Sequence, residues 1–290
     1  QFEQGSSLRI SAGLLYALRH NAGNGHTCLP REKLLQSTAQ FLRVAPEEIS
    51  RGLDELLKTE ELREQQFDGT SYIYLPDLLS AEADIAARLG ELSTFPTEAP
   101  KTLDSDIRAM EIVQGFAYAP LQREAIRLAL SSRVMVLTGG PGTGKTTTVN
   151  AILSLYEAQA DRVALCAPTG RAAKRLSELT GHTASTIHRL LEVDYTTGNV
   201  RFIHNEKNLL KYDVIILDEM SMVDAKLFQA LLAAARYHCR IIMVGDADQL
   251  PSVGAGNVLG EILRAGVVPT VRLTEIFRQA QKSLIVQNAH

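Results

Sequence analysis

A glycine-rich segment between residues 139 and 146 carries residue types that together can hold a chain of phosphates. It reads Gly-Gly-Pro-Gly-Thr-Gly-Lys-Thr and matches G-x-x-x-x-G-K-[ST] directly after an apolar run. Glycines let backbone N–H groups face phosphate oxygens, and the helix expected next adds its positive N-terminal dipole. Lys145 should reach the β and γ phosphates, and the Thr146 hydroxyl should bind Mg²⁺. A ligand-free turn would explain neither side chain, so the sequence predicts an ATP and Mg²⁺ site whose loop residues are Gly140, Pro141, Gly142, Thr143, Gly144, Lys145, Thr146 and Thr147.

Two adjacent acids, Asp218 and Glu219, follow the apolar run 214–217. The ends of parallel strands line the ligand crevice in sheets of this kind. We expect Asp218 to hold the Mg²⁺ shell and Glu219 to orient and deprotonate an attacking water. Acids also cap strands without chemical purpose, but this pair lies downstream of a phosphate loop. It therefore favours hydrolysis of ATP over phosphate transfer to a small acceptor.

Three further polar residues are weaker candidates. Gln249 follows the apolar run 241–244, and its amide could sense the γ-phosphate. Gln122 could hydrogen-bond an adenine edge, although an isolated glutamine in a helix is usually solvated. Arg278 could be a surface cation or contact the γ-phosphate.

Short apolar runs alternate with helical patterns through residues 101–290. Such runs suit parallel strands buried on both faces, so the expected fold class is α/β, with a central parallel sheet that carries the P-loop and is flanked by helices. The expected strands are 134–138, 163–167, 214–217 and 241–244. An alternating stretch about Thr197 and Gly198 predicts a hairpin inserted at about 192–205.

The first hundred residues have a different pattern. Three helical stretches precede two alternating runs around Asp68 and Gly69, which predicts a small, mainly helical, winged-helix-like domain. A further helix and a proline-containing linker place the domain boundary near residue 100, giving domains 1–100 and 101–290. Winged-helix domains bind DNA or serve as packing modules. The expected elements are helices 8–20, 32–41, 46–58 and 77–92, a hairpin of 62–67 with 71–75, and a linker at 94–101.

Charge divides unevenly along the chain. Residues 1–100 hold 9 Lys+Arg against 15 Asp+Glu, a net of −6, which leaves 21 against 18, a net of +3, for the remainder. The acidic first part should repel phosphate unless its few cations gather on one face, so any DNA site is expected in the second part, and a packing role is favoured for the first. Signal-peptide and membrane-span patterns are not evident, so we expect a cytoplasmic protein. Cys28, Cys166 and Cys239 are too dispersed for a zinc site or disulfide framework.

Six segments, in this order, resemble the RecD-like helicases, the B branch of superfamily 1. They are GGPGTGKTTT, APTGRAAKRL, STIHRLL, VIILDEMSMVD, GDADQLPSVGAGNVL and LTEIFRQA. The resemblance covers about residues 115–285. It implies a motor of two RecA-like domains, ATP between them, single-stranded DNA across their tops and 5′ to 3′ movement. The N-terminal extension is similar to that of the stand-alone type.

The resemblance also assigns roles by position. Gln122 matches the adenine-contacting glutamine, and Gln249 and Arg278 match γ-phosphate contacts, which would make Lys145, Glu219, Gln249 and Arg278 the catalytic set. The stretch 192–205 is similar to the pin that splits the duplex. Thr169 and Thr186 could serve equally as helix N-caps. The expected DNA-contacting residues are Pro168, Thr169, Gly170, Arg171, Ser185, Thr186 and His188.

These observations predict an ATP-dependent DNA helicase or translocase acting on single-stranded DNA and duplex junctions in DNA repair or recombination. We expect a monomer, with a single-strand-binding protein or recombination proteins as candidate partners. We also expect the chain to be a fragment ending after the first RecA-like domain, and to bind nucleotide weakly and hydrolyse it poorly alone. Two alternatives stay open, an ATP-gated single-stranded DNA-binding module without unwinding and a P-loop kinase.

Overall fold

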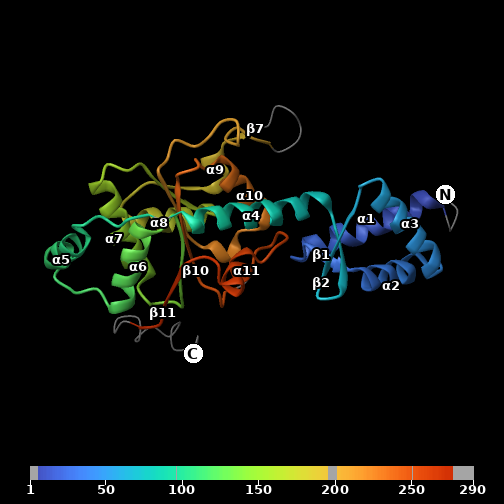
Figure 1. Ribbon diagram of the computed structural model, residues 1–290, viewed down its shortest axis with the longest axis horizontal. Coiled ribbons are helices and arrows are strands. Elements are labelled where there is room, and N and C mark those ends of the chain that lie inside the picture. The colour runs from blue at the N-terminus through green and yellow to red at the C-terminus, as the bar shows by residue number, and fades with distance from the viewer. Residues whose placement is uncertain (1–5, 96, 195–200, 250, 277–290) are drawn as a thin grey trace. The chain divides into compact units, whose positions relative to one another are not determined.

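A computed structural model describes residues 6–95, 97–194, 201–249 and 251–276 (Figure 1). The chain divides into two compact units. The first comprises Gln1–Ile85, Asp224–Gln229 and Pro251–Asn257, and the second comprises Ala86–Val223, Ala230–Leu250 and Val258–His290. Helix α4 begins in the first unit and ends in the second. The domain boundary expected near residue 100 stays a prediction.

The first unit contains the expected three helices and hairpin. Asp68 and Gly69 have φ angles of 47° and 77°, the two positive values that a type I′ hairpin turn requires. A short additional strand, β1, pairs antiparallel with β3 and gives the sheet order β1-β3-β2, an element that the sequence analysis missed. The elements are α1 (Ser7–Gly23), β1 (Cys28–Pro30), α2 (Arg31–Leu42), α3 (Pro46–Lys58), β2 (Arg63–Phe67), β3 (Thr70–Tyr74) and α4 (Pro76–Thr94).

Close helix packing forms the core of this unit. Leu14, Leu34 and Leu53 are fully buried, one from each of the three helices. Two glycines allow the helices to approach. A Cβ at Gly13 would lie 2.7 Å from Leu42 Cδ1, and a Cβ at Gly52 would lie 2.5 Å from Ile10 Cγ2.

A six-stranded parallel sheet forms the second unit, as expected for the α/β class, in the order β11-β4-β10-β9-β5-β6. All four expected strands are present. The strands are β4 (Val134–Gly139), β5 (Val163–Ala167), β6 (Ala184–Thr186), β9 (Val214–Leu217), β10 (Arg240–Gly245) and β11 (Thr270–Leu273). The sequence analysis did not predict β6 or β11, because each is short and β11 alternates buried with exposed residues.

Helices connect these strands. They are α5 (Leu103–Gln114), α6 (Pro120–Ser131), α7 (Lys145–Ala158), α8 (Gly170–Thr180), α9 (Ile187–Leu191), α10 (Ala225–Ala234) and α11 (Val258–Ala265), with the 3-10 helix η1 (Met220–Met222) after β9. Among the described helices, none combines the length and apolar character needed to cross a membrane. Within the described part of the chain the three cysteines form no disulfide, and Cys166 and Cys239 are buried.

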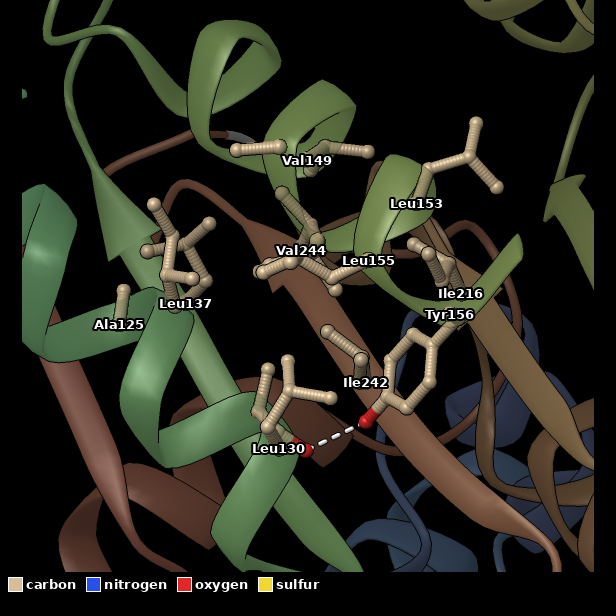
Figure 2. Packing of buried hydrophobic residues seen from close by; sticks show 14 of the residues in the cluster. Ala125, Leu130, Leu137, Val149, Leu153, Leu155, Tyr156, Ile216, Ile242 and Val244 are labelled. Atoms are coloured by element: carbon tan, nitrogen blue, oxygen red, sulfur yellow. Dashed lines mark hydrogen bonds between the residues drawn. The ribbon is translucent and has the colours of Figure 1, made fainter. Parts of the chain in front are cut away.

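The core of the second unit lies between the sheet and the helices α6 and α7 (Figure 2). Leu137, Ile216 and Val244 extend from three neighbouring strands toward Leu130 of α6 and Val149 of α7. This packing fixes the strand ends, and therefore fixes the loops that follow them.

The expected inserted hairpin has its two strands in the structure. Strand β7 (Val193–Asp194) pairs antiparallel with β8 (Arg201–Phe202). Its tip, residues 195–200, lies outside the described residues. Backbone bonds from Ile203 N to Glu192 O at 2.8 Å and from His204 N to Leu191 O at 3.0 Å attach the hairpin base to the end of α9.

Candidate functional site

The order of the parallel strands brings the predicted site residues to one edge of the sheet. All six strands run in the same direction, so their carboxyl ends meet there. The phosphate loop follows β4, and the Asp218–Glu219 pair follows β9, two strands away. The segments expected to contact DNA follow β5 and β6. The residues predicted to bind nucleotide and those predicted to contact DNA therefore follow strands in adjoining halves of one edge.

The loop after β4 has the backbone that a phosphate cradle needs. Gly142 and Gly144 have φ angles of 78° and 84°, values that a residue with a Cβ adopts only with strain. A Cβ at Gly139 would lie 2.7 Å from Leu273 O and 2.8 Å from Thr143 Oγ1, so only glycine fits between the loop and β11. Helix α7 begins at Lys145, directly after Gly144. Its N-terminus therefore faces the loop.

Lys145 lies over its own loop. Its Nζ donates hydrogen bonds to Gly139 O at 2.5 Å and to Gly140 O at 3.0 Å. Burial lowers the pKa of Lys145, while the carboxylates of Asp246, Asp218 and Glu219 oppose that shift. The ammonium is thus held where three acids surround it and where phosphate oxygens could replace the two carbonyls.

Asp218 and Glu219 form an acidic pair in a poorly hydrated position. Burial raises the pKa of Asp218, against the Glu219 backbone hydrogen bond and the charges of Lys145 and Arg175. Burial also raises the pKa of Glu219, and the neighbouring Asp218 charge adds to that rise. Glu219 has a φ of 53°, an uncommon left-handed conformation for a residue with a side chain. A raised pKa and a strained backbone are typical of residues that act as bases.

The donor set fits Mg²⁺ bound together with a nucleotide. Among the described residues, no group of three His, Cys, Asp or Glu residues could hold a metal by itself. Mg²⁺ commonly takes one or two protein oxygens and completes its shell with phosphate and water. Thr146 and Asp218 would supply those two oxygens. The ion would neutralise phosphate charge, and Lys145 would bind the phosphates from the loop.

Gln122 has a different environment from the one expected. Its side chain is 2% exposed. Its Oε1 accepts from Ala119 N at 3.0 Å, and its Nε2 donates to Gly144 O at 3.3 Å. The amide therefore ties the start of α6 to the phosphate loop. A contact with adenine would exchange one of these bonds and stays a prediction.

Asp246 and Arg175 were not singled out by the sequence analysis. Asp246 directly follows β10, is 4% exposed, and accepts a hydrogen bond from Asp248 N at 3.1 Å. The rule that selected Asp218, an acid after a buried strand, would have found it. Arg175 lies on α8, and its charge lowers the pKa of both Asp218 and Glu219. No feature of the sequence indicated that electrostatic interaction.

The two residues predicted to contact the γ-phosphate are Gln249 and Arg278. Gln249 is exposed at the same edge, where its backbone N–H donates to Asp246 O at 3.3 Å. Its role at the γ-phosphate stays a prediction. Arg278 lies outside the described residues.

The predicted DNA-contacting segments meet at the ends of β5 and β6. Register pairs Ala167 with Thr186, so Pro168 and His188 follow neighbouring strand ends. Thr169 Oγ1 accepts from Ala172 N at 3.2 Å, and Thr186 Oγ1 accepts from Arg189 N at 3.1 Å. Both threonines are therefore helix N-caps, the alternative that the sequence left open. Arg171 and His188 are exposed, and Ser185 and Gly170 lie beside them in the chain. DNA contact by these segments stays a prediction.

Comparison with known proteins finds one matching domain family and several related proteins. Residues 122–255 match the AAA domain family. The chain is 38% identical over 293 residues to the ATP-dependent RecD2 DNA helicase of Deinococcus radiodurans, covering 97% of this chain and 40% of that protein. It is 46% identical over 165 residues to the RecBCD enzyme subunit RecD of Mycolicibacterium smegmatis, covering 49% and 30%.

The resemblance to RecD-like helicases is confirmed. It extends to the ATP-dependent DNA helicase dda of Enterobacteria phage T4, 39% identical over 127 residues, covering 42% of this chain and 29% of that protein. The first match also includes the N-terminal unit, whereas the other two do not cover the whole chain. The chain spans 40% or less of the length of these relatives. The chain is similar to a RecD-like helicase over 97% of its length, and residues 122–255 match the AAA domain family.

Proposed function

We propose that this chain carries the first motor domain of an ATP-dependent DNA helicase that moves 5′ to 3′ along single-stranded DNA in repair or recombination. Residues 101–290 form the proposed motor domain, and residues 1–100 the N-terminal domain. The proposed substrates are single-stranded DNA and duplex junctions, and the proposed location is the cytoplasm. The observation that carries the proposal is the shared sheet edge, where the phosphate loop and acids on β4, β10 and β9 adjoin the DNA segments on β5 and β6.

This arrangement supports coupling between hydrolysis and strand movement. Strand β9 pairs with β5, and Asp218 N donates to Cys166 O at 2.9 Å. Glu219 would deprotonate the attacking water, while Lys145 stabilises charge that develops on the phosphates. A shift of either neighbouring loop would be transmitted through this rigid strand pair. The match to proteins named as ATP-dependent DNA helicases supports the same activity.

ATP hydrolysis with and without single-stranded DNA tests the proposal. The natural full-length protein should hydrolyse ATP many-fold faster with single-stranded DNA. Glu219→Gln should keep ATP binding and lose turnover. Glu124→Gln, an exposed glutamate on α6, is the matched control and should behave as wild type. Equal rates with and without DNA would exclude a translocase and favour a P-loop kinase.

Polarity needs its own measurement. We expect strand displacement on duplexes with a 5′ single-stranded tail and none on duplexes with a 3′ tail. Preference for the 3′ tail would overturn the proposed direction of movement but not the proposed DNA-stimulated ATP hydrolysis. DNA-stimulated hydrolysis without displacement of either duplex would favour the ATP-gated binding module.

A further inference from the structure

A row of three stacked rings lies on the surface of the N-terminal unit. Tyr16 and His20 are one turn apart on α1, with ring centroids 5.8 Å apart and planes at 15°. Phe41 of α2 stacks on the other side of Tyr16 at 5.7 Å, again at 15°. Tyr16 is the middle ring, so the outer faces of the row belong to His20 and Phe41. Tyr16 is 55% exposed and Phe41 65% exposed.

Helix packing builds this row. Gly13 lies one turn before Tyr16, and it contacts Leu42, the neighbour of Phe41. A side chain at Gly13 would separate the two helices and the rings with them. Large aromatic side chains are usually buried, because exposing them to water is unfavourable. Two of them held parallel and exposed therefore form a surface suited to a flat ligand.

Two arginines lie next to Leu42, at the Phe41 end of the row, although the N-terminal part as a whole is acidic. From Ser6 to Arg31 the chain has no Asp or Glu. Arg9 donates to Leu42 O at 3.2 Å, which holds a guanidinium beside Phe41. Arg43, exposed and with a φ of 55°, follows Leu42 directly at the end of α2. Glu32 lies in the first turn of α2, nine residues before Phe41, and most other acids of this unit come later in the chain, on α3, the hairpin and α4.

We propose that the outer face of Phe41 stacks a nucleobase of single-stranded DNA, with the strand's phosphates beside Arg9 and Arg43. Parallel aromatic rings interleaved with cations are the arrangement that binds single strands without sequence preference. The acidic first turn of α3, with Glu47 and Glu48, disfavours the alternative of an α3 helix inserted into duplex DNA. This second site of contact with single-stranded DNA rests on the proposed function, because it needs single-stranded DNA as the substrate.

A single fluorescent reporter tests the contact directly. The chain contains no tryptophan, so Phe41→Trp introduces the only one. Oligo(dT) should quench its fluorescence, because a base stacks on the indole. An abasic strand of the same length should leave the fluorescence unchanged. Phe67→Trp is the matched control. Phe67 is 50% exposed in the same unit but lies beside Asp68, and its reporter should not respond to DNA.

Two further substitutions separate stacking from charge. In a protein with tryptophan at position 41, Tyr16→Ala removes the ring that packs against the inner face of that position and holds it in the row. It should weaken the quenching titration by at most the roughly 5- to 100-fold expected for complete loss of one stacked base. Arg43→Glu changes an exposed charge, leaves the fold intact, and should reduce the salt dependence of the titration. Circular dichroism of each variant checks that the helices persist.

The possible outcomes are distinguishable. Binding of a dye-labelled strand, followed by anisotropy, reports contact anywhere on the protein. If anisotropy rises but the reporter at position 41 is unquenched, the N-terminal contact is wrong and the motor site stands. If poly-glutamate quenches the reporter and DNA does not, the row binds an acidic protein segment and the proposal is overturned. If neither signal responds to DNA, the proposed function fails as well.

Discussion

The phosphate edge of the sheet and the aromatic row of the N-terminal unit differ in how their residues are specified. At the sheet edge, the loop residues are consecutive in the chain and the acids directly follow buried strands. In the aromatic row, Tyr16 and Phe41 come from two helices, and packing at Gly13 brings them together. The first site is encoded in spacing along the chain, whereas the second is encoded in tertiary packing.

That difference has a physical origin. A phosphate cradle needs backbone N–H groups and a lysine at fixed positions, so the chain must carry them in one order. A stacking surface needs only flat rings and nearby cations, which many arrangements provide. Function at the sheet edge should therefore be sensitive to the loss of single functional groups. Function at the aromatic row should be sensitive to changes in the helix packing beneath the rings.

Lys145→Ala should produce the largest effect and separate the two regions. Loss of the ammonium removes the main positive charge at the phosphates, so DNA-stimulated ATP hydrolysis should fall roughly 100- to 1,000-fold. Fluorescence of a tryptophan at position 41 should still respond to single-stranded DNA. Steady-state hydrolysis and the quenching titration measure these two effects. Loss of both signals in a folded variant would show that the regions are not independent.

Gly52→Ala should act on the packing of the N-terminal unit. The added methyl would lie 2.5 Å from Ile10 Cγ2, a stiff β-branched group, and overpacking of this kind costs about 1–3 kcal/mol. Gly90→Ala is the matched control, because a Cβ there meets nothing within 4 Å and alanine favours the helix. Urea unfolding should show a destabilised first variant and an unchanged or stabilised second one. Equal stabilities would refute the tight helix contact.

The sequence predicted the four central strands and the phosphate loop because each has a strong local signal. Continuous apolar runs identify buried parallel strands, and the glycine-lysine spacing identifies the loop. The same reasoning predicted the hairpin turn at Asp68 and Gly69, where both backbone φ angles are positive. These features depend on residues within about ten positions of one another.

Features that depend on distant residues escaped prediction. Strand β6 has three residues of intermediate exposure and is recognisable only by its pairing with β5. The bond from Gln122 to Gly144 joins residues 22 positions apart, and the sequence suggested a ligand contact instead. Arg175 affects Asp218 and Glu219 only because α8 packs beside β5. Spacing along the chain carries no information of this kind.

Tyr156→Phe should have a moderate effect confined to the core of the second unit. Tyr156 is fully buried among the core residues of this unit (Figure 2). Its hydroxyl donates to Ala129 O and accepts a hydrogen bond from Arg240 Nη1 at 3.4 Å. Removing it leaves the Ala129 carbonyl without that donor, at a cost of about 1–2 kcal/mol. Tyr237→Phe, at an exposed ring, should have almost no effect on stability. A stability of Tyr156→Phe equal to wild type would show that this bond contributes nothing.

Glu219→Gln should have the smallest effect on the stability of the fold. Whether it raises or lowers the Tm distinguishes a carboxylate kept for catalysis from one that stabilises the packing. Burial and the Asp218 charge raise the pKa of Glu219, so the folded protein favours the protonated carboxyl more than the unfolded chain does. The resulting stability is present below the ordinary glutamate pKa and is lost as pH rises through the raised value. At pH 7.5 the charge is therefore unfavourable, and the neutral amide should raise the Tm of the nucleotide-free protein by about 1–3 °C. Near pH 4 this gain should vanish, because wild-type Glu219 is then protonated too. A lower Tm at pH 7.5 would mean that the carboxylate stabilises the fold, and that the acidic pair is structural rather than held at an energetic cost for hydrolysis.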